Sequence, residues 1–423
     1  MNENIIILLI FIFAYIFFII FPKYKSIISI SAAILIVFIT SISFIETIKF
    51  INWNILGLIA GTLILSELFI NSRYPAFLAD SIINKSPNLT IAMIFLCILT
   101  EFISIFLENV ACVLLLAPVA LNLCKKAKIS PIPLIIAMSL SSNLQGTATL
   151  IGDPPSMIMA SYQHMTFNDF FFYKGRISIF FFVEAGALAS LIVLFFIFKK
   201  QKNSVKLEKE KVVSFFPLIL IILMVIFLAI SGLFDRENKF LAGIISLGLA
   251  LIGIVWSGYS NFLKPLDIFK KFDWGTLFFL IGIFVLTGSL EKTGVLNHIA
   301  NIIAGLAGKD ILKIYIIILV LSVCISAFID NVPFISVMLP VVGSLAGKVG
   351  VSQTIMIFAL LIGSCLGGNI TPFGATANIV AVGILNKHKY KVSFLEFIKI
   401  GLPFTIVTVL FSSILLWFVW KNA

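Results

Sequence analysis

The sequence predicts an all-α polytopic membrane protein built from two inverted-topology repeats. Of its 423 residues, 61% are hydrophobic and only 12% are charged, whereas soluble proteins are roughly 45–50% apolar and about 25% charged. Apolar runs of about 18 residues, the length that crosses a bilayer, recur from end to end. The second half of the chain also repeats motifs of the first half at one constant offset.

The expected elements follow from these apolar runs. The first run lacks the basic start and cleavage site of a signal peptide, so it is interpreted as a retained span. Two segments, 90–124 and 311–347, are expected to be helical hairpins that enter and leave the membrane on one side. Crossings are expected near 5–21, 27–45, 53–70, 131–163, 177–198, 214–231, 240–257, 274–290, 353–386 and 399–419.

An offset of 222 residues relates the two halves. The motif FLENVACVLLLAP matches FIDNVPFISVMLP, and GTATLIGDPPS matches GNITPFGATAN without a gap. We therefore expect a first repeat over 1–205 and a second over 206–423. Five predicted crossings separate matched points, and an odd number inverts the second copy in the membrane.

Loop charges agree with this topology and place the protein in the cell membrane. The net charge of +11 arises mainly from 20 of the 30 basic residues, Lys25 among them, which fall in loops on one side. Cytoplasmic loops carry such an excess, so nucleic acid is not an expected partner. Lys174 and Arg176 fall on the other side, where an interfacial amphipathic segment is expected. No nucleotide-binding glycine motif or Cys/His metal-ligand spacing occurs, so no cofactor is expected beyond a coupling ion.

Each repeat contains a helix that its own residues must interrupt, over 131–163 and 353–386. In the first, Pro154 and Pro155 lack backbone N–H groups, and Pro155 disfavours a helical conformation at Pro154. Free backbone groups at membrane depth are tolerated only where protein covers them or they line a wet cavity. They can bind a dehydrated cation, and a helix N-terminus can bind an anion. A structural kink is the alternative, but two breaks at matched positions favour a binding site.

The hairpin tips hold a second signal, because each places a carboxylate and an amide between apolar arms. These pairs are Glu108 with Asn109 and Asp330 with Asn331. A carboxylate inside a membrane costs about 2.5–3.5 kcal/mol on insertion scales, and such residues usually mark ion or proton pathways. Helix capping by the asparagines is an alternative that is compatible with ligand binding.

Other acidic residues at membrane depth give a weaker signal. Glu67, Glu101 and Glu184 have no counterpart in the other repeat and are interpreted as paired or interfacial residues. Asp153 belongs to the first break, and its counterpart is Ala375, so Asp153 can act in one half only.

The motifs ENVACVLLLAP, GTATLIGDPPS, IDNVPF and GGNITPFGATAN resemble those of the ion transporter superfamily. The closest pattern is the arsenite permease and pink-eyed-dilution (P) protein branch, with its citrate-transporter-like domain. The resemblance implies an elevator-type architecture, in which a scaffold that is usually dimeric holds a mobile transport domain of hairpins and broken helices. A homodimer is therefore expected, with the lipid bilayer and a small inorganic or organic ion as partners.

In dicarboxylate transporters of this superfamily, a Ser-Asn-Thr triplet at each hairpin tip and the broken-helix loops hold sodium and substrate. Residue by residue, the resemblance implies a set of residues that bind ion or substrate, to which the acidic residues above are added. It also implies sodium at Asn109, Thr149, Asn331 and Thr371. The full set is Glu108, Asn109, Thr147, Thr149, Gly152, Asp153, Asp330, Asn331, Asn369, Thr371, Gly374 and Asn378.

This chain departs from the triplet, with Glu-Asn-Val and Asp-Asn-Val at its tips. Carboxylates there repel an anionic substrate unless protons or cations neutralise them. The leading hypothesis is a secondary active transporter of a small ion or oxyanion, of the arsenite or anion type, coupled to sodium or protons. A sodium/proton antiporter is the alternative. A passive anion channel and an intramembrane enzyme are remote ones, so no enzymatic activity is expected.

Overall fold

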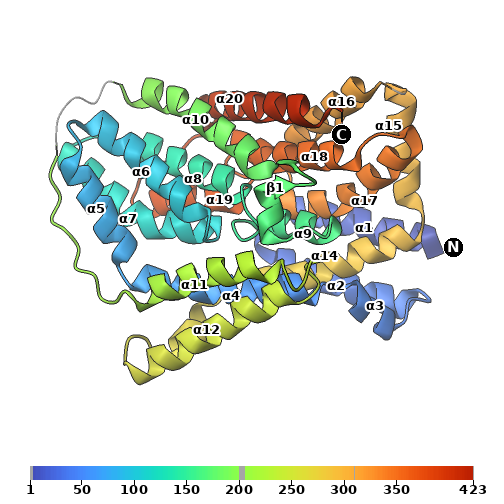
Figure 1. Cartoon of the computed structure of the whole chain (residues 1–423), viewed down its shortest axis with the longest axis horizontal. Helices are drawn as coiled ribbons and strands as arrows, with labels where there is room; N and C mark the ends of the chain where they lie inside the picture. The colour runs from blue at the N-terminus through green and yellow to red at the C-terminus, as the bar shows by residue number, and fades with distance from the viewer. Residues whose placement is uncertain (1–2, 200–204, 309, 423) are drawn as a thin grey trace.

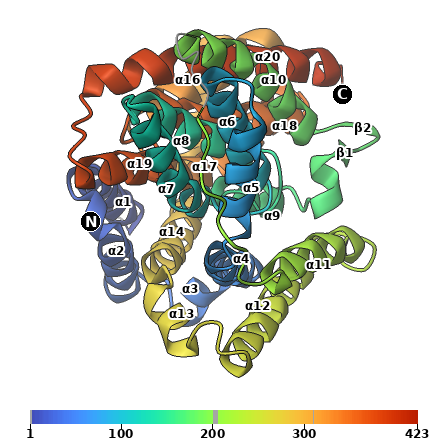
Figure 2. The ribbon, with the colours of Figure 1, turned by 90° about the vertical axis from the view of Figure 1, so that its left-hand side faces the viewer.

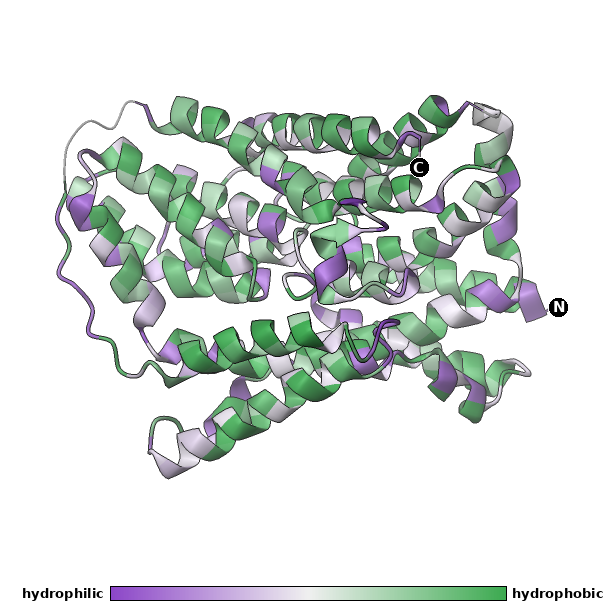
Figure 3. Ribbon diagram, viewed as in Figure 1, coloured by the Kyte–Doolittle hydropathy of each residue, from purple (hydrophilic) through white to green (hydrophobic). Residues whose placement is uncertain are grey.

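The computed structural model describes residues 3–199, 205–308 and 310–422. Residues 200–204 of the expected charged loop between the repeats lie outside these ranges. Within them the chain forms twenty α-helices, three short 3-10 helices and one two-stranded sheet. Ten helices are long and apolar enough to cross a membrane, and hydrophobic residues predominate along the long helices (Figure 3). The predicted class, an all-α polytopic membrane protein, is confirmed.

Ten α-helices form the first half of the described chain. They are α1 (Glu3–Ile20), α2 (Lys25–Ile39), α3 (Phe44–Phe50), α4 (Trp53–Asn71), α5 (Tyr74–Lys85), α6 (Leu89–Ser104), α7 (Asn109–Ala127), α8 (Ile132–Gly146), α9 (Pro154–Tyr162) and α10 (Ile179–Phe198). The short elements are η1 (Pro22–Tyr24), η2 (Phe167–Phe170), β1 (Phe172–Tyr173) and β2 (Arg176–Ile177).

Ten more α-helices follow in the second half. They are α11 (Phe216–Ser231), α12 (Leu241–Tyr259), α13 (Pro265–Lys271), α14 (Trp274–Lys292), α15 (Val295–Ala307), α16 (Ile311–Ser326), α17 (Asn331–Val349), α18 (Gln353–Gly367), α19 (Thr376–Lys387) and α20 (Phe394–Trp420), with η3 (Gly368–Ile370) between α18 and α19.

The two halves correspond helix by helix. Helix α7 begins at Asn109 and α17 begins 222 residues later at Asn331. Each expected hairpin consists of two helices, α6 with α7 and α16 with α17. Each expected broken helix is interrupted, between α8 and α9 and between α18 and α19. The interruptions therefore occur where the glycines, prolines and polar residues of the two motifs lie.

The helices form two groups (Figures 1 and 2). In one group, α4 packs along α12 and α14 packs along α2, with α1 and α11 beside them. In the other, α6 packs on α8, α16 packs on α18, and α10 packs along α20. Every residue of α18 after Gln353 is buried, so the two broken helices lie in the centre of the second group, where apolar neighbours cover them.

Two local features were not anticipated in detail. Lys174 and Arg176, expected in an interfacial amphipathic segment, belong to a β-hairpin in which Tyr173 pairs with Arg176. Lys174 and Gly175 both have positive φ angles, 49° and 78°, and a two-residue turn with this backbone twist joins antiparallel strands well. The short helices α5 and α15, each between a long helix and a hairpin, were also not expected.

Small residues set the contact between α4 and α12. A Cβ atom at Gly57 would lie 3.1 Å from the Cα of Gly243, and one at Gly61 would overlap the backbone of Ser246. Small residues spaced four apart let membrane helices approach closely, and close approach is their main source of packing energy in lipid. The sequence GLIAG of α4 therefore fixes the distance between these helices.

We expect Gly61→Ala to lower the melting temperature of the detergent-purified protein by a few degrees. The new methyl group overlaps the Ser246 backbone, and overpacking of this kind costs about 1–3 kcal/mol. Gly248→Ala in α12 is the matched control, because a Cβ there meets no atom within 4 Å. Equal melting temperatures for the two variants would contradict this account of the interface.

Candidate functional site

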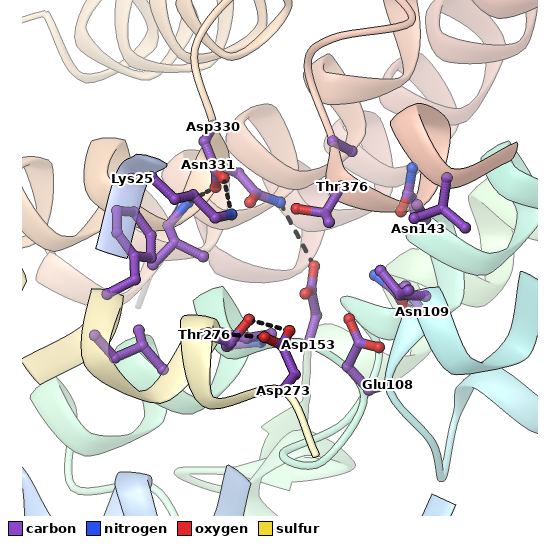
Figure 4. Close-up of a pocket in the computed structure, with 18 residues that line it drawn as sticks. Lys25, Glu108, Asn109, Asn143, Asp153, Asp273, Thr276, Asp330, Asn331 and Thr376 are labelled. Atoms are coloured by element: carbon purple, nitrogen blue, oxygen red, sulfur yellow. Dashed lines mark hydrogen bonds and ion pairs between the residues drawn. The ribbon is translucent and has the colours of Figure 1, made fainter. Parts of the chain in front are cut away.

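A cavity of about 200 Å³ lies where the two hairpin tips, the two helix breaks and the first turns of α2 and α14 meet (Figure 4). Both groups of helices contribute to it. Its charged and polar lining residues are Lys25, Glu108, Asn109, Asn143, Asp153, Asp273, Thr276, Asp330, Asn331 and Thr376.

Four carboxylates face this cavity, and each is the N-cap residue of a helix. Glu108 precedes α7 and accepts a hydrogen bond from the backbone N–H of Ala111 at 3.1 Å. Asp330 precedes α17 and accepts one from Val332 at 3.1 Å. Helix N-termini carry partial positive charge and unpaired N–H groups, so they stabilise ionised carboxylates.

The other two carboxylates occupy equivalent positions on different helices. Asp273 precedes α14, accepting from the N–H of Thr276 at 3.0 Å and from its hydroxyl at 2.6 Å. Asp153 precedes α9 and makes no side-chain cap bond; the Asn331 amide lies 3.5 Å from its Oδ2 atom. The Asp153 carboxylate is therefore the most weakly bound of the four.

One ammonium group opposes these carboxylates. Lys25 is the first residue of α2, and its charge fits the pattern of cytoplasmic loops. Its Nζ atom lies 3.0 Å from Oδ2 of Asp330. Among the described lining residues Lys25 is the single basic one. When all groups are ionised the cavity carries excess negative charge. This arrangement attracts cations and binds protons, while it repels anions unless cations accompany them.

The threonines of the broken helices lie behind the cavity and hold the hairpins. The hydroxyl of Thr149 donates to the Ile105 carbonyl at 2.6 Å, and that of Thr371 donates to the Ala327 carbonyl at 2.5 Å. Both bonds join residues that correspond at the 222-residue offset. The two breaks are thus attached to the two hairpins by the same contact.

Each break also folds back on itself through paired glycines. A Cβ atom at Gly152 would lie 2.6 Å from the Gly146 carbonyl oxygen, and one at Gly374 would lie 2.6 Å from that of Gly368. Backbone therefore touches backbone, and no other residue fits at these positions. The side chain of Asn378 closes the second loop by donating to the Gly368 and Thr371 carbonyls, each at 3.1 Å.

Five of the twelve predicted site residues line the cavity, and seven lie behind it. The five are Glu108, Asn109, Asp153, Asp330 and Asn331. The seven are Thr147, Thr149, Gly152, Asn369, Thr371, Gly374 and Asn378, all buried in or next to the two helix breaks. Sodium at the two threonines remains a prediction. Within the described residues, no three of the His, Cys, Asp and Glu side chains are placed to hold a metal ion.

Asn143 of α8 joins the two repeats. Its Nδ2 atom donates to Oδ1 of Asn369 at 2.8 Å and to Oδ1 of Asn378 at 3.0 Å. All three side chains are buried. Asn143 was not predicted because its counterpart, Cys365, is not an amide. Asn143 lies on the cavity wall, and through these two bonds it connects α8 of the first repeat to the helix break of the second repeat.

Two side cavities, one smaller and one larger than the central cavity, differ in whether they border it. A cavity of about 120 Å³ between α4, α7 and α13 shares Glu108 and Asp273 with it and contains the Glu67–Lys271 ion pair, 2.9 Å long. A cavity of about 320 Å³ near Lys49 and Glu291 is lined by α14 and α17 of the second half and by α3, α4 and α9 of the first half. This one shares no lining residue with the central cavity. Of these two side cavities, the one between α4, α7 and α13 borders the central cavity.

Comparison with known proteins places the chain among membrane transporters. A family model described as citrate transporter matches residues 15–363. An uncharacterized transporter of Mycobacterium bovis is 31% identical over 389 residues, which cover 87% of this chain and 86% of that protein. The P protein of Mus musculus is 25% identical over 443 residues, 85% of this chain and 53% of the P protein. This chain thus spans about half of the P protein.

Two solved structures share the fold. The YdaH transporter of Alcanivorax borkumensis, described as having an unusual topology, superposes with a TM-score of 0.61 at 14% identity and covers 88% of this chain and 87% of that one. Neisseria gonorrhoeae MtrF, described within a class of antimetabolite efflux pumps, gives 0.56 at 16% identity and covers 89% of this chain and 83% of that one. At these identities the likeness extends to the fold alone.

We expect Asn143→Leu to lower the melting temperature. The substitution leaves the buried Oδ1 atoms of Asn369 and Asn378 without this donor, and each unsatisfied buried group costs about 1–3 kcal/mol. Ser139→Ala, on the same helix, is the control, because the Ser139 hydroxyl bonds only within its own turn. A melting temperature for Asn143→Leu as high as that of Ser139→Ala would rule out this bridge as a stabilising contact.

Proposed function

The chain belongs to the citrate transporter family, and we propose that it is a secondary active transporter that exchanges sodium for protons at its acidic central cavity. It is a membrane transporter of the citrate transporter and P protein type. The observation that carries the finer proposal is the charge of the cavity, where four carboxylates face a single ammonium group. Intramembrane carboxylates of this kind are typical of ion and proton pathways.

The proposed exchange uses the cavity carboxylates as sites where sodium and protons alternate. Oxygen atoms of carboxylates, amides and hydroxyls suit a hard cation, and the amides of Asn109 and Asn331 lie beside the carboxylates. A sodium ion favours the ionised carboxylates, as the helix N-termini do, so its entry releases protons. Lys25 neutralises Asp330 when neither ion is bound there.

Alternating access is proposed to follow an elevator motion. The hairpins and broken helices would move together, because Thr149 and Thr371 attach them to one another. The layer containing α2, α4, α12 and α14 would stay fixed. The Lys25–Asp330 pair joins these two groups, so it must break when they move. The side cavity near Lys49 is the proposed opening on the opposite side.

Transport of an anion or oxyanion with coupled cations is the second candidate. The family description names citrate, and Lys25 together with the N-termini of α9 and α19 offers positive charge at the cavity wall. In this version sodium or protons would first neutralise the carboxylates. A homodimer, as the resemblance implies, remains a prediction.

The exchange is tested with purified protein in proteoliposomes that contain a pH dye and no organic or oxyanion substrate. An imposed sodium gradient is expected to change the lumenal pH, and Asp330→Asn is expected to slow this change at least about tenfold, because it removes the ionisable group. Asp310→Asn is the matched control, since Asp310 caps α16 outside the cavity. An unchanged rate in Asp330→Asn, or no pH change with folded wild-type protein, refutes the exchange.

Lys25→Met separates the two candidates. For sodium/proton exchange we expect the variant to remain active and to reach half-maximal rate at a lower sodium concentration, because the ammonium group no longer competes for Asp330. For anion transport, the loss of the single basic lining residue abolishes uptake of labelled citrate or arsenite. Uptake of either anion by the wild type that Lys25→Met eliminates would favour the second candidate.

A further inference from the structure

A second polar cluster lies inside the first repeat, among α6, α8 and α10. Its members are Glu101 of α6, Ser141 and Gln145 of α8, and Glu184 of α10. None of them lines the central cavity. The Gln145 Nε2 atom donates to Oε1 of Glu184 at 2.9 Å, and Glu101 lies beside Ser141 and interacts electrostatically with Glu184. Glu184 is half-buried, so the cluster reaches the surface there.

Three oxygen atoms in this cluster are buried without a hydrogen-bond partner: Oε1 of Glu101, Oγ of Ser141 and Oε1 of Gln145. The exposed fractions of these residues are 6%, 0% and 2%. The Gln145 amide nitrogen already donates to Glu184, so its carbonyl oxygen must find a donor elsewhere. Each such orphaned group costs about 1–3 kcal/mol. Two of the three oxygens can only accept, which means that a donor or cation is missing.

The second repeat shows that the fold does not need polar residues here. At the 222-residue offset, Val323, Gly363 and Gly367 take the places of Glu101, Ser141 and Gln145. There α16 and α18 approach so closely that a Cβ at Gly367 would lie 2.6 Å from the Val323 Cα atom. Equivalent helices thus pack through glycines in one repeat and around a carboxylate in the other. Glu101 was interpreted as a paired or interfacial residue; its neighbours are Ser141 and Glu184, and its Oε1 atom has no hydrogen-bond partner.

We propose that Glu101, Ser141, Gln145 and Glu184 form a proton-binding site separate from the central cavity, with the proton held on Glu101. Protonation turns an acceptor-only carboxylate into an O–H donor, for which Ser141 Oγ and Gln145 Oε1 are available acceptors. One O–H bond forms on Glu101 and one breaks in the donor, which is water or the Glu184 carboxylic acid. The proposal rests on the buried oxygens and stands independently of sodium/proton exchange.

A proton fits this site better than a metal ion. The cluster meets the surface only through Glu184, in the apolar helix α10, beside the exposed side chain of Leu188. A hydrated sodium ion has no polar route there, whereas a proton can pass between acids. The titratable groups that interact with Glu101 in the described part of the chain are Glu184 of α10 and Cys97 of α6 itself. No cationic side chain among them favours the ionised form.

The test is infrared spectroscopy of the purified protein at neutral pH, because a buried protonated carboxylic acid gives a C=O stretching band distinct from that of a carboxylate. The wild type is expected to show this band, and Glu101→Gln, the isosteric mimic of the protonated acid, is expected to lose it. Glu67→Gln is the matched control, since Glu67 is paired with Lys271, and it should keep the band. This readout does not depend on transport.

Absence of the band in the wild type, or its persistence unchanged in folded Glu101→Gln, overturns the proposal. Loss, on adding sodium, of the component of the band that Glu101→Gln removes overturns it as well, because this site would then bind a cation. Should Glu101→Gln fail to fold, Ser141→Ala decides the matter. Removal of the hydroxyl should shift the band of a Glu101 proton beside it, and an unshifted band overturns the assignment.

Discussion

Four carboxylates converge on one cavity because four helices begin there. Glu108, Asp153, Asp273 and Asp330 each precede a helix that starts at the cavity wall. An uninterrupted bundle of membrane helices has its N-termini at the membrane surfaces. Hairpins and broken helices bring three of these helix ends, those of α7, α9 and α17, with their positive partial charge, to the interior, and α14 begins beside them after the short helix α13. The acidic site, the helix breaks and the duplicated architecture therefore depend on one electrostatic requirement, that helix N-termini reach the interior and stabilise the carboxylates there.

Duplication explains how such an interior is kept rigid without continuous helices. The same threonine-to-carbonyl contact, in Thr149 and in Thr371, attaches a break to a hairpin in both halves. Paired glycines let each break return on its own backbone. Asn143 then connects one repeat to the loop of the other. In a continuous helix these backbone groups would bond within the helix. Here they bond to a small number of specific, buried partners, on which the geometry of the breaks depends.

The local sequence predicts the helix breaks, but it does not predict every residue that lies beside them in the folded chain. Prolines and glycines forbid a helix whatever surrounds them, so the breaks and the tip residues Glu108 and Asp330 were predictable. Lys25 and Asp273 were not, because their role depends on where α2 and α14 lie in space. A finer comparison of the repeats offered a signal: Asp273 precedes Trp274 as Asn52 precedes Trp53. The lysine-glycine turn of the β-hairpin was also predictable from the sequence, but the apolar residues around it obscured the signal.

The Lys25–Asp330 contact has a consequence for how tightly the proposed transport is coupled. The ammonium group belongs to α2, so in the proposed elevator motion it would stay behind when the hairpin tip moves. A tip that departs without a bound ion therefore exposes a bare carboxylate to the low-dielectric interior, at a cost of about 2.5–3.5 kcal/mol on insertion scales. That cost would slow the movement of the hairpin tip without a bound ion about a hundredfold. A tethered counter-charge on the stationary layer would thus suppress leakage, so that ion gradients are not dissipated by an unloaded carrier.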